Sequence, residues 1–192
     1  MGLEAFALLL FTALISALAT LLYKGVTGWS QAPLLGVAAL AGYALADVAS
    51  GLTHWFCDTF FEEDSPLIGP VLIFPFREHH RDPTGMTRHG FLELTGNSCL
   101  GMLPVLGAAL LWRPLPPYVA AGLIAFALGL FATNLFHKWA HSASVPGWVA
   151  WCQRRRLILS PSVHAVHHTP PNRSAYCVTS GWANRLLDRL LP

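Results

Sequence analysis

Four long runs of apolar residues dominate the pattern of this chain. They occupy residues 3–23, 33–56, 91–112 and 118–141, and few charged side chains interrupt them. A helix needs about 20 residues to cross a hydrocarbon core of about 30 Å. Each run is therefore long enough to span a membrane. We expect an all-α integral membrane protein with four transmembrane helices, forming a single domain over residues 1–192.

The segments between these runs differ in length and character. Short proline-marked turns, 27–33 and 113–118, join the first two runs and the last two. The segment 62–90 contains four prolines and is expected to be a loop without a long helix. Near residue 150, two tryptophans followed by three arginines are typical of a segment lying at the membrane interface. The stretch 182–191 has the pattern of a short amphipathic helix.

The composition supports a membrane location and suggests an orientation. Hydrophobic residues make up 54% of the chain and charged residues 11%, against about 25% charged residues in a soluble domain. Of the 12 lysines and arginines, only Lys24 and Arg113 fall on one side of the predicted membrane. The positive-inside rule then places both termini and segments 57–90 and 142–192 in the cytoplasm, at a bacterial inner membrane or the endoplasmic reticulum. The net charge of +2 is too small to suggest a nucleic-acid partner.

All nine histidines fall on this predicted cytoplasmic side, close to or beyond the membrane ends. They are His54, His79, His80, His89, His137, His141, His164, His167 and His168. Nine unrelated core histidines would not segregate to one side in this way. The distribution predicts a common purpose.

The spacing of the histidines places several of them on shared helix faces. His54 and Asp58 are four residues apart near the end of the second run. Asn134, His137 and His141 share one face of the fourth. The "HAVHH" of 164–168 also forms one face if it is helical. These groups can converge with the histidines of the loop on one polar cluster.

Such a cluster predicts a metal site. Imidazole nitrogen suits iron, zinc, copper and nickel, whereas a tetrahedral zinc ion needs only four ligands. Eight or nine histidines with a carboxylate fit two metals of higher coordination number, and nitrogen-rich ligation without thiolate suggests non-haem iron. Asp58 is expected either as a ligand or as the acceptor for a histidine N–H. Asp47 lies deeper and is expected to hydrogen-bond between helices.

Two non-enzymatic interpretations fit less well. A b-type cytochrome needs two histidines for each haem, usually within the helix bundle, whereas these lie at the helix ends and include adjacent pairs. A metal transporter or sensor is expected to carry ionisable residues near the midplane of several spans, and Asp47 is nearly alone there.

Four motifs together resemble a known family. "HWFCDTF" (54–60), "FREHHRDPTGMTRHG" (76–90), "TNLFHKWAHS" (133–142) and "HAVHHTPPNRSAYCVTSGWANRLLD" (164–188) are similar to the Kua-type lipid desaturase domain. The resemblance runs from about residue 29 to residue 187, and the motifs occur in the family's order. One departure is Gly90, which follows His89 where relatives commonly have an acidic residue.

The resemblance implies a plasmanylethanolamine desaturase activity. Two iron ions and O₂ would introduce the vinyl-ether double bond between C1 and C2 of the sn-1 alkyl chain of an ether phospholipid. The ligands implied are the nine histidines and Asp58. Asn134, on the same helix face as His137 and His141, is expected to lie next to the ligands without binding the metal. A sister branch acts on an acyl chain of another phospholipid, so a related acyl desaturase or hydroxylase remains an alternative.

The resemblance also suggests partners. Arg77, Arg81 and Arg88 are expected either to meet the lipid phosphate or to anchor the protein at the membrane surface. Because the chain contains no flavin or dinucleotide fingerprint, electrons are expected from a cytochrome b5-like or ferredoxin-like donor on the cytoplasmic face.

Overall fold

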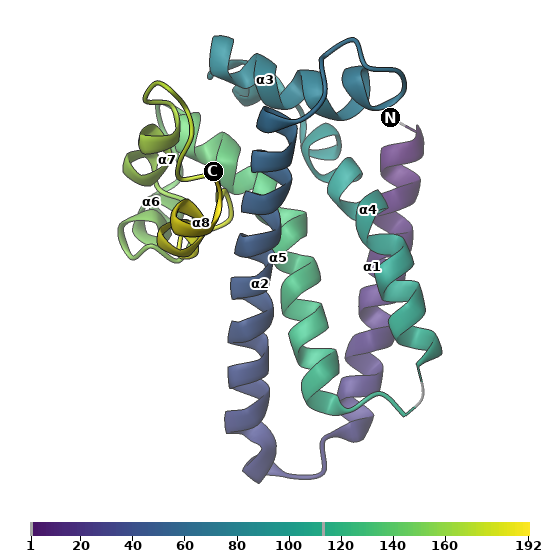
Figure 1. Cartoon of the computed structure of the whole chain (residues 1–192). Helices are drawn as coiled ribbons and strands as arrows, with labels where there is room; N and C mark the ends of the chain where they lie inside the picture. Colours follow the sequence, from purple (N-terminus) through teal and green to yellow (C-terminus); the bar gives the residue numbers. More distant parts are fainter. Residues whose placement is uncertain (1, 113) are drawn as a thin grey trace. The chain divides into compact units, whose positions relative to one another are not determined.

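A computed structural model describes residues 2–112 and 114–192 and is helical throughout, with no strand among these residues. Four helices are long and apolar enough to cross a membrane: α1 (Gly2–Gly25), α2 (Ala32–Thr59), α4 (Phe91–Leu111) and α5 (Pro117–His141) (Figure 1). Their bounds lie within three residues of the predicted runs. The all-α fold with four membrane-spanning helices is therefore confirmed. Arg113, on which the predicted orientation partly rests, lies outside the described residues.

The chain divides into two compact units. Unit 1 comprises Met1–Ala46 and Gly90–Ala132, as far as these ranges are described. Unit 2 comprises Asp47–His89 and Thr133–Pro192. The helices α2 and α5 each begin in unit 1 and end in unit 2.

Unit 1 is a helical bundle with an apolar core. The buried residues of its hydrophobic cluster come from α1, α4 and α5, among them Phe11, Leu18 and Leu106. The Phe11 and Phe131 rings stack with centroids 5.6 Å apart. Large apolar side chains also point outward: Leu9 is 72% exposed and Val37 is 65% exposed. Outward-facing apolar residues suit a lipid environment, where the outside of a bundle needs no polar cover.

Glycines allow two helices of unit 1 to approach closely. A Cβ added to Gly42 on α2 would lie 2.0 Å from the carbonyl oxygen of Gly122 on α5. About two turns further along α5, a Cβ added to Gly129 would lie 2.7 Å from the Ala46 side chain. Small residues at such a crossing replace side-chain contact with backbone contact, as is common between membrane helices.

Unit 2 contains the C-terminal ends of α2 and α5 and the shorter helices that follow each of them. A π-helical turn, Gly69–Ile73, leads into α3 (Phe74–Arg81), and a 3₁₀ turn follows at Gly85–Arg88. The segment expected to be a loop is therefore partly helical. The reason is that Pro75 occupies the first turn of α3, where a missing N–H costs nothing.

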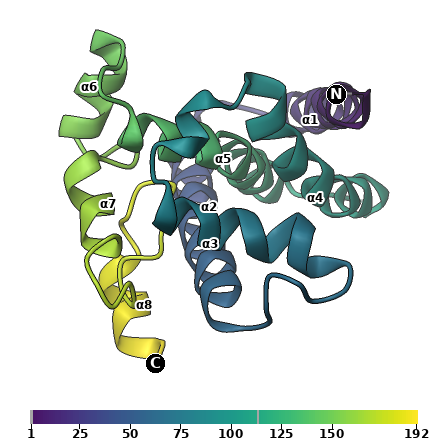
Figure 2. The same cartoon turned by 90° about the horizontal axis from the view of Figure 1, so that it is seen from above.

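The C-terminal third of the chain supplies three short helices to unit 2. These are α6 (Gly147–Arg154), α7 (Pro161–His167) and α8 (Asn184–Leu190), and they follow one another along one side of this unit in Figure 2. The helix expected near 182–191 is confirmed. Trp148 and Trp151 on α6 are 61% and 49% exposed, in keeping with an interfacial segment.

The segment before α8 is attached to α2 by a buried carboxylate. Asp47 is fully buried and accepts hydrogen bonds from the backbone amides of Ser180, Gly181 and Ala183. Asp47 was expected to hydrogen-bond between helices, but its partners are backbone amides of the turn before α8. The tail folds back onto α2. The amides of its turn bind the carboxylate, whereas the amides inside an apolar helix are already bonded to that helix's own carbonyls.

We predict opposite effects for two Gly→Ala variants on α2. Gly42→Ala should lower the free energy of unfolding by about 1–3 kcal/mol, because the new methyl meets the Gly122 backbone. Gly36→Ala is the matched control, since nothing lies within 4 Å of its added Cβ. Gly36→Ala should raise the free energy of unfolding by about 0.5–1 kcal/mol, because alanine lowers the conformational entropy of the unfolded chain. Unfolding in detergent measures both; equal effects would contradict the close helix approach.

Candidate metal centre

The ends of α2 and α5 provide the first four polar groups of the site. His54 and Asp58 lie one turn apart on α2, and His137 and His141 lie one turn apart on α5. His54 is fully buried and His137 is 6% exposed. Both helices carry these groups in their last turns, within unit 2.

Two short helices provide five more histidines. His79 and His80 occupy the last turn of α3, and α7 carries His164 and His167, with His168 at its C-terminal cap. The start of α7 is well defined by sequence: Ser160 accepts a hydrogen bond from the Val163 amide, and Pro161 occupies the first turn. This local helix places the three histidines of "HAVHH" on one face, as predicted.

One group of imidazoles centres on His164. Its Nε2 lies 2.8 Å from Nε2 of His137, 2.8 Å from Nε2 of His141 and 3.0 Å from Nε2 of His168. These nitrogens come from the end of α5 and from α7 with its C-terminal cap. With one nitrogen of His79, the five ligand atoms of this group lie within 4.8 Å of one another.

A second group forms around Asp58. Its Oδ2 lies 3.1 Å from His80 Nε2 and 3.5 Å from Nε2 of both His54 and His167. The four histidines of this group are His54, His79, His80 and His167, again with ligand atoms within 4.8 Å. His79 thus belongs to both groups. We call the first the His164 group and the second the Asp58 group.

Backbone carbonyls orient three of these rings. Nδ1 of His54 lies 3.1 Å from the Tyr176 carbonyl oxygen, and Nδ1 of His167 lies 2.8 Å from that of Ser174. Nδ1 of His79 bonds to the carbonyl of Phe76. A carbonyl oxygen only accepts, so Nδ1 carries the proton and Nε2 keeps its lone pair. This arrangement is the usual one behind a metal-ligating histidine.

Burial keeps the imidazoles uncharged. It lowers the pKa of His79 to about 3, with the neighbouring His80 as the second cause. Burial and then His141 lower the pKa of His168 to about 4 and also lower that of His164. Neutral imidazole is the form that binds metal.

The residues fit a metal by their unsatisfied atoms as well. Within the described part of the chain, Nε2 of His54 and Nε2 of His79 are buried without a hydrogen-bond partner. Leaving a buried polar atom unpaired costs about 1–3 kcal/mol, and a bound cation would remove that cost. Two sets of neutral nitrogens, one with a carboxylate, suit first-row metals of high coordination number.

The lipid desaturase domain, as a protein family, matches residues 43–191 of this chain. The chain belongs to this family. All the histidines of both groups lie within the matched range.

Curated relatives support the same assignment. The chain is 43% identical over 189 residues to the plasmanylethanolamine desaturase of Myxococcus xanthus, covering 97% of this chain and 66% of that protein. It is 40% identical over 169 residues to plasmanylethanolamine desaturase 1 of Mus musculus, covering 83% and 62%. Fatty acid desaturase 4, chloroplastic, of Arabidopsis thaliana is 34% identical over 175 residues, covering 87% and 53%. The chain thus spans somewhat less than two thirds of the length of these relatives. No solved structure matches it significantly.

In this member of the lipid desaturase domain family, one of the predicted histidines, His89, lies outside the two histidine groups. His89 is exposed and belongs to neither group; its backbone carbonyl accepts a hydrogen bond from Lys138 at 2.7 Å. Asn134 lies half-buried on α5, one turn before His137. The structure therefore brings together eight of the nine histidines and Asp58.

The three arginines expected near the lipid phosphate are paired with acidic residues. Arg81 makes two bonds to Glu63, at 2.7 and 3.0 Å, and Arg88 bonds to Asp82 at 2.6 Å. Arg77 bonds to Glu62 and to backbone carbonyls at the end of α2. The three guanidinium groups are thus already bonded to carboxylates of the protein. Their contact with a lipid phosphate stays a prediction.

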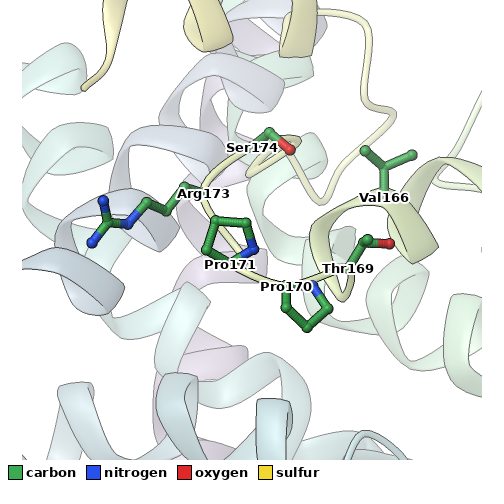
Figure 3. A pocket seen from close by; sticks show the side chains of 6 residues that line it. All are labelled: Val166, Thr169, Pro170, Pro171, Arg173 and Ser174. Carbon is green, nitrogen blue, oxygen red and sulfur yellow. The ribbon is translucent and has the colours of Figure 1, made fainter.

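A surface pocket of about 370 Å³ lies beside the end of α7. Figure 3 shows Arg173 on one side and Val166 and Thr169 on the other, with two prolines between them. None of the nine histidines lines this pocket. It is therefore separate from the metal-binding groups, although Ser174 lines it and also accepts from His167.

Sequence reasoning missed the carbonyls of Phe76, Ser174 and Tyr176. A main-chain acceptor can be supplied by any residue type, so no residue signal identifies it in advance. Only the fold shows which carbonyl faces which imidazole.

We predict that His164→Ala will lose most of the bound metal, because it removes the nitrogen at the centre of the His164 group. His89→Ala should retain the wild-type metal content, since His89 lies outside both groups. Metal analysis of the purified variants, at equal protein concentration, measures the difference. Loss of metal in His89→Ala would show that His89 is a ligand after all.

Proposed function

We propose that this protein introduces a vinyl-ether double bond between C1 and C2 of the sn-1 alkyl chain of an ether phospholipid. The observation that carries this proposal is the identity of 43% and 40% to two plasmanylethanolamine desaturases. The convergence of eight histidines, five of them buried, supports it, because removing hydrogen from an alkyl chain requires a strong oxidant that side chains cannot provide.

Two iron ions are the cofactor that this donor set suits best. His137, His141, His164 and His168 would hold one ion, and His54, His80 and His167 with Asp58 would hold the other. His79 lies within reach of both. Nitrogen-rich ligation without thiolate favours non-haem iron. When bound, the two ions supply the activation of O₂.

The surrounding protein prepares the site for that chemistry. Carbonyls behind His54, His79 and His167 hold the Nδ1 protons, so each Nε2 lone pair points inward. Burial excludes water from the imidazoles, which protects a reactive centre from side reactions. The chain of the lipid must be held with its first two carbons beside this cluster.

The overall reaction requires electrons from outside. Two hydrogen atoms leave the –O–CH₂–CH₂– unit; with two further electrons and two protons, O₂ is reduced to two molecules of water. A cytochrome b5-like or ferredoxin-like protein would supply the two electrons. We propose that it docks on the cytoplasmic face, where the positive-inside rule places unit 2 and both termini.

A second substrate is favoured by one comparison. The relative at 34% identity is named a fatty acid desaturase, so the same centre would act there on an acyl chain. A shared fold does not decide the lipid. Lipid analysis must therefore distinguish a new vinyl ether from a new acyl double bond.

We predict that expression in a bacterium without plasmalogens, supplied with alkyl ether phospholipid, will produce acid-labile vinyl ethers. His167→Ala or His168→Ala should abolish the product and leave the protein in the membrane, because each removes one imidazole nitrogen of a group. Mass spectrometry before and after acid treatment measures the product, and immunoblotting of membranes measures the protein. Full product in either variant would exclude that histidine as a ligand.

A further inference from the structure

One face of α2 carries four polar residues in register. Asp47, Ser50, His54 and Asp58 follow at spacings of three and four residues. His54 and Asp58 belong to the Asp58 group, whereas Asp47 and Ser50 lie deeper along the helix. At about 1.5 Å per residue, Asp47 is about 10 Å from His54 along the helix axis, too far for direct contact with the same metal.

The carboxylate of Asp47 binds the turn before α8. Its Oδ1 accepts from the amides of Ser180 at 2.6 Å and Gly181 at 2.9 Å, and its Oδ2 accepts from the amide of Ala183 at 2.9 Å. Asp47 is fully buried. Three converging amides stabilise one buried negative charge, and charge-assisted bonds of this kind are about twice as strong as neutral ones.

Further contacts fasten the residues just before this turn to α2. Ser50 Oγ donates to the Asp47 carbonyl at 2.7 Å and accepts from the Val178 amide at 3.1 Å. A Cβ added to Gly51 would lie 2.6 Å from Cys177 Sγ. The segment 177–183 therefore lies directly on the helix that carries His54.

The same segment provides the carbonyl that orients His54. Tyr176 accepts from His54 Nδ1, and Ser174, two residues earlier, accepts from His167 Nδ1. Residues 175–180 are all buried, so this backbone has little freedom to move by itself. Asp188 and Asn184 bind the amides of Ala175 and Cys177 from within the tail, whereas Asp47 and Ser50 make the bonds that attach this backbone to α2.

We propose that Asp47 is a positioning residue for the Asp58 group: it fixes segment 174–183 on α2 so that two carbonyls orient His54 and His167. The inference rests on the proposed metal centre. Asp47 touches neither histidine and acts through the backbone. Loss of its charge should therefore weaken metal binding mainly at the Asp58 group, leaving the His164 group loaded.

The first test is an anaerobic titration of Fe²⁺ into chelator-treated, full-length protein in detergent. Asp47→Ala should weaken binding of one of the two ions by about 10–100-fold, the usual effect of losing a group that orients a ligating histidine. Asp47→Asn should lie between Asp47→Ala and the wild type, because an amide oxygen still accepts while its NH₂ cannot.

A matched control separates positioning from general instability. Leu106→Ala removes a fully buried side chain from the core of unit 1, whereas segment 174–183 belongs to unit 2. Compared with Asp47→Ala at equal folded fraction, it should keep wild-type affinity for both ions. If both variants lose metal to the same extent, Asp47 is merely structural and the inference fails.

Hydrogen exchange of the metal-free protein provides a second readout. Asp47→Ala should speed exchange at the amides of 176–183 and leave α4 unchanged. Wild-type exchange there, or unchanged affinity for both ions, would refute the positioning role while leaving the proposed function intact. A wild-type protein that binds no Fe²⁺ would instead refute the metal centre itself, and the role of Asp47 with it.

Discussion

Unit 2 depends on keeping eight imidazole rings close together, five of them buried. Protonated histidines at separations of about 3 Å would repel one another strongly in a medium of low dielectric constant. Burial and mutual proximity lower the pKa of His79, His164 and His168, so the rings stay neutral and their lone pairs remain available. The same neutrality leaves buried nitrogens without partners. A site of this kind is costly unless cations occupy it, which links its folding to metal binding.

The elements around the site follow from that requirement. Two long helices end at the cluster and each contributes two of its polar side chains, whereas α3 and α7 are short and contribute adjacent or near-adjacent histidines. The tail contributes no ligand from its side chains beyond α7. Its backbone carbonyls orient His54 and His167, and buried bonds to Asp47 and Ser50 hold this backbone in place. The helix α2 thus carries two of the polar groups itself and also holds the tail backbone that orients the rings of His54 and His167.

Charge is arranged differently on the two polar stretches of unit 2. On the stretch between α2 and α4, Arg77, Arg81 and Arg88 pair with acidic neighbours. These pairs are exposed and each contributes little to stability, about 0–1 kcal/mol, but together they occupy the guanidinium groups that sequence reasoning assigned to lipid phosphate. The arginines after α6 have fewer acidic neighbours in the sequence, and they follow two exposed tryptophans, as expected at a membrane interface.

The sequence by itself determined the four spanning helices, the helical face of "HAVHH" and a set of nine histidines expected to converge, because apolar length and histidine spacing are local properties of the chain. Only the tertiary structure decided that His89 stays outside, that the histidines divide into two groups sharing His79, and that Asp47 binds the tail. Those outcomes depend on contacts between residues as far apart as Asp47 and Ala183. Backbone amides and carbonyls make the decisive bonds, and since every residue carries them, no residue type in the sequence marks which ones will meet.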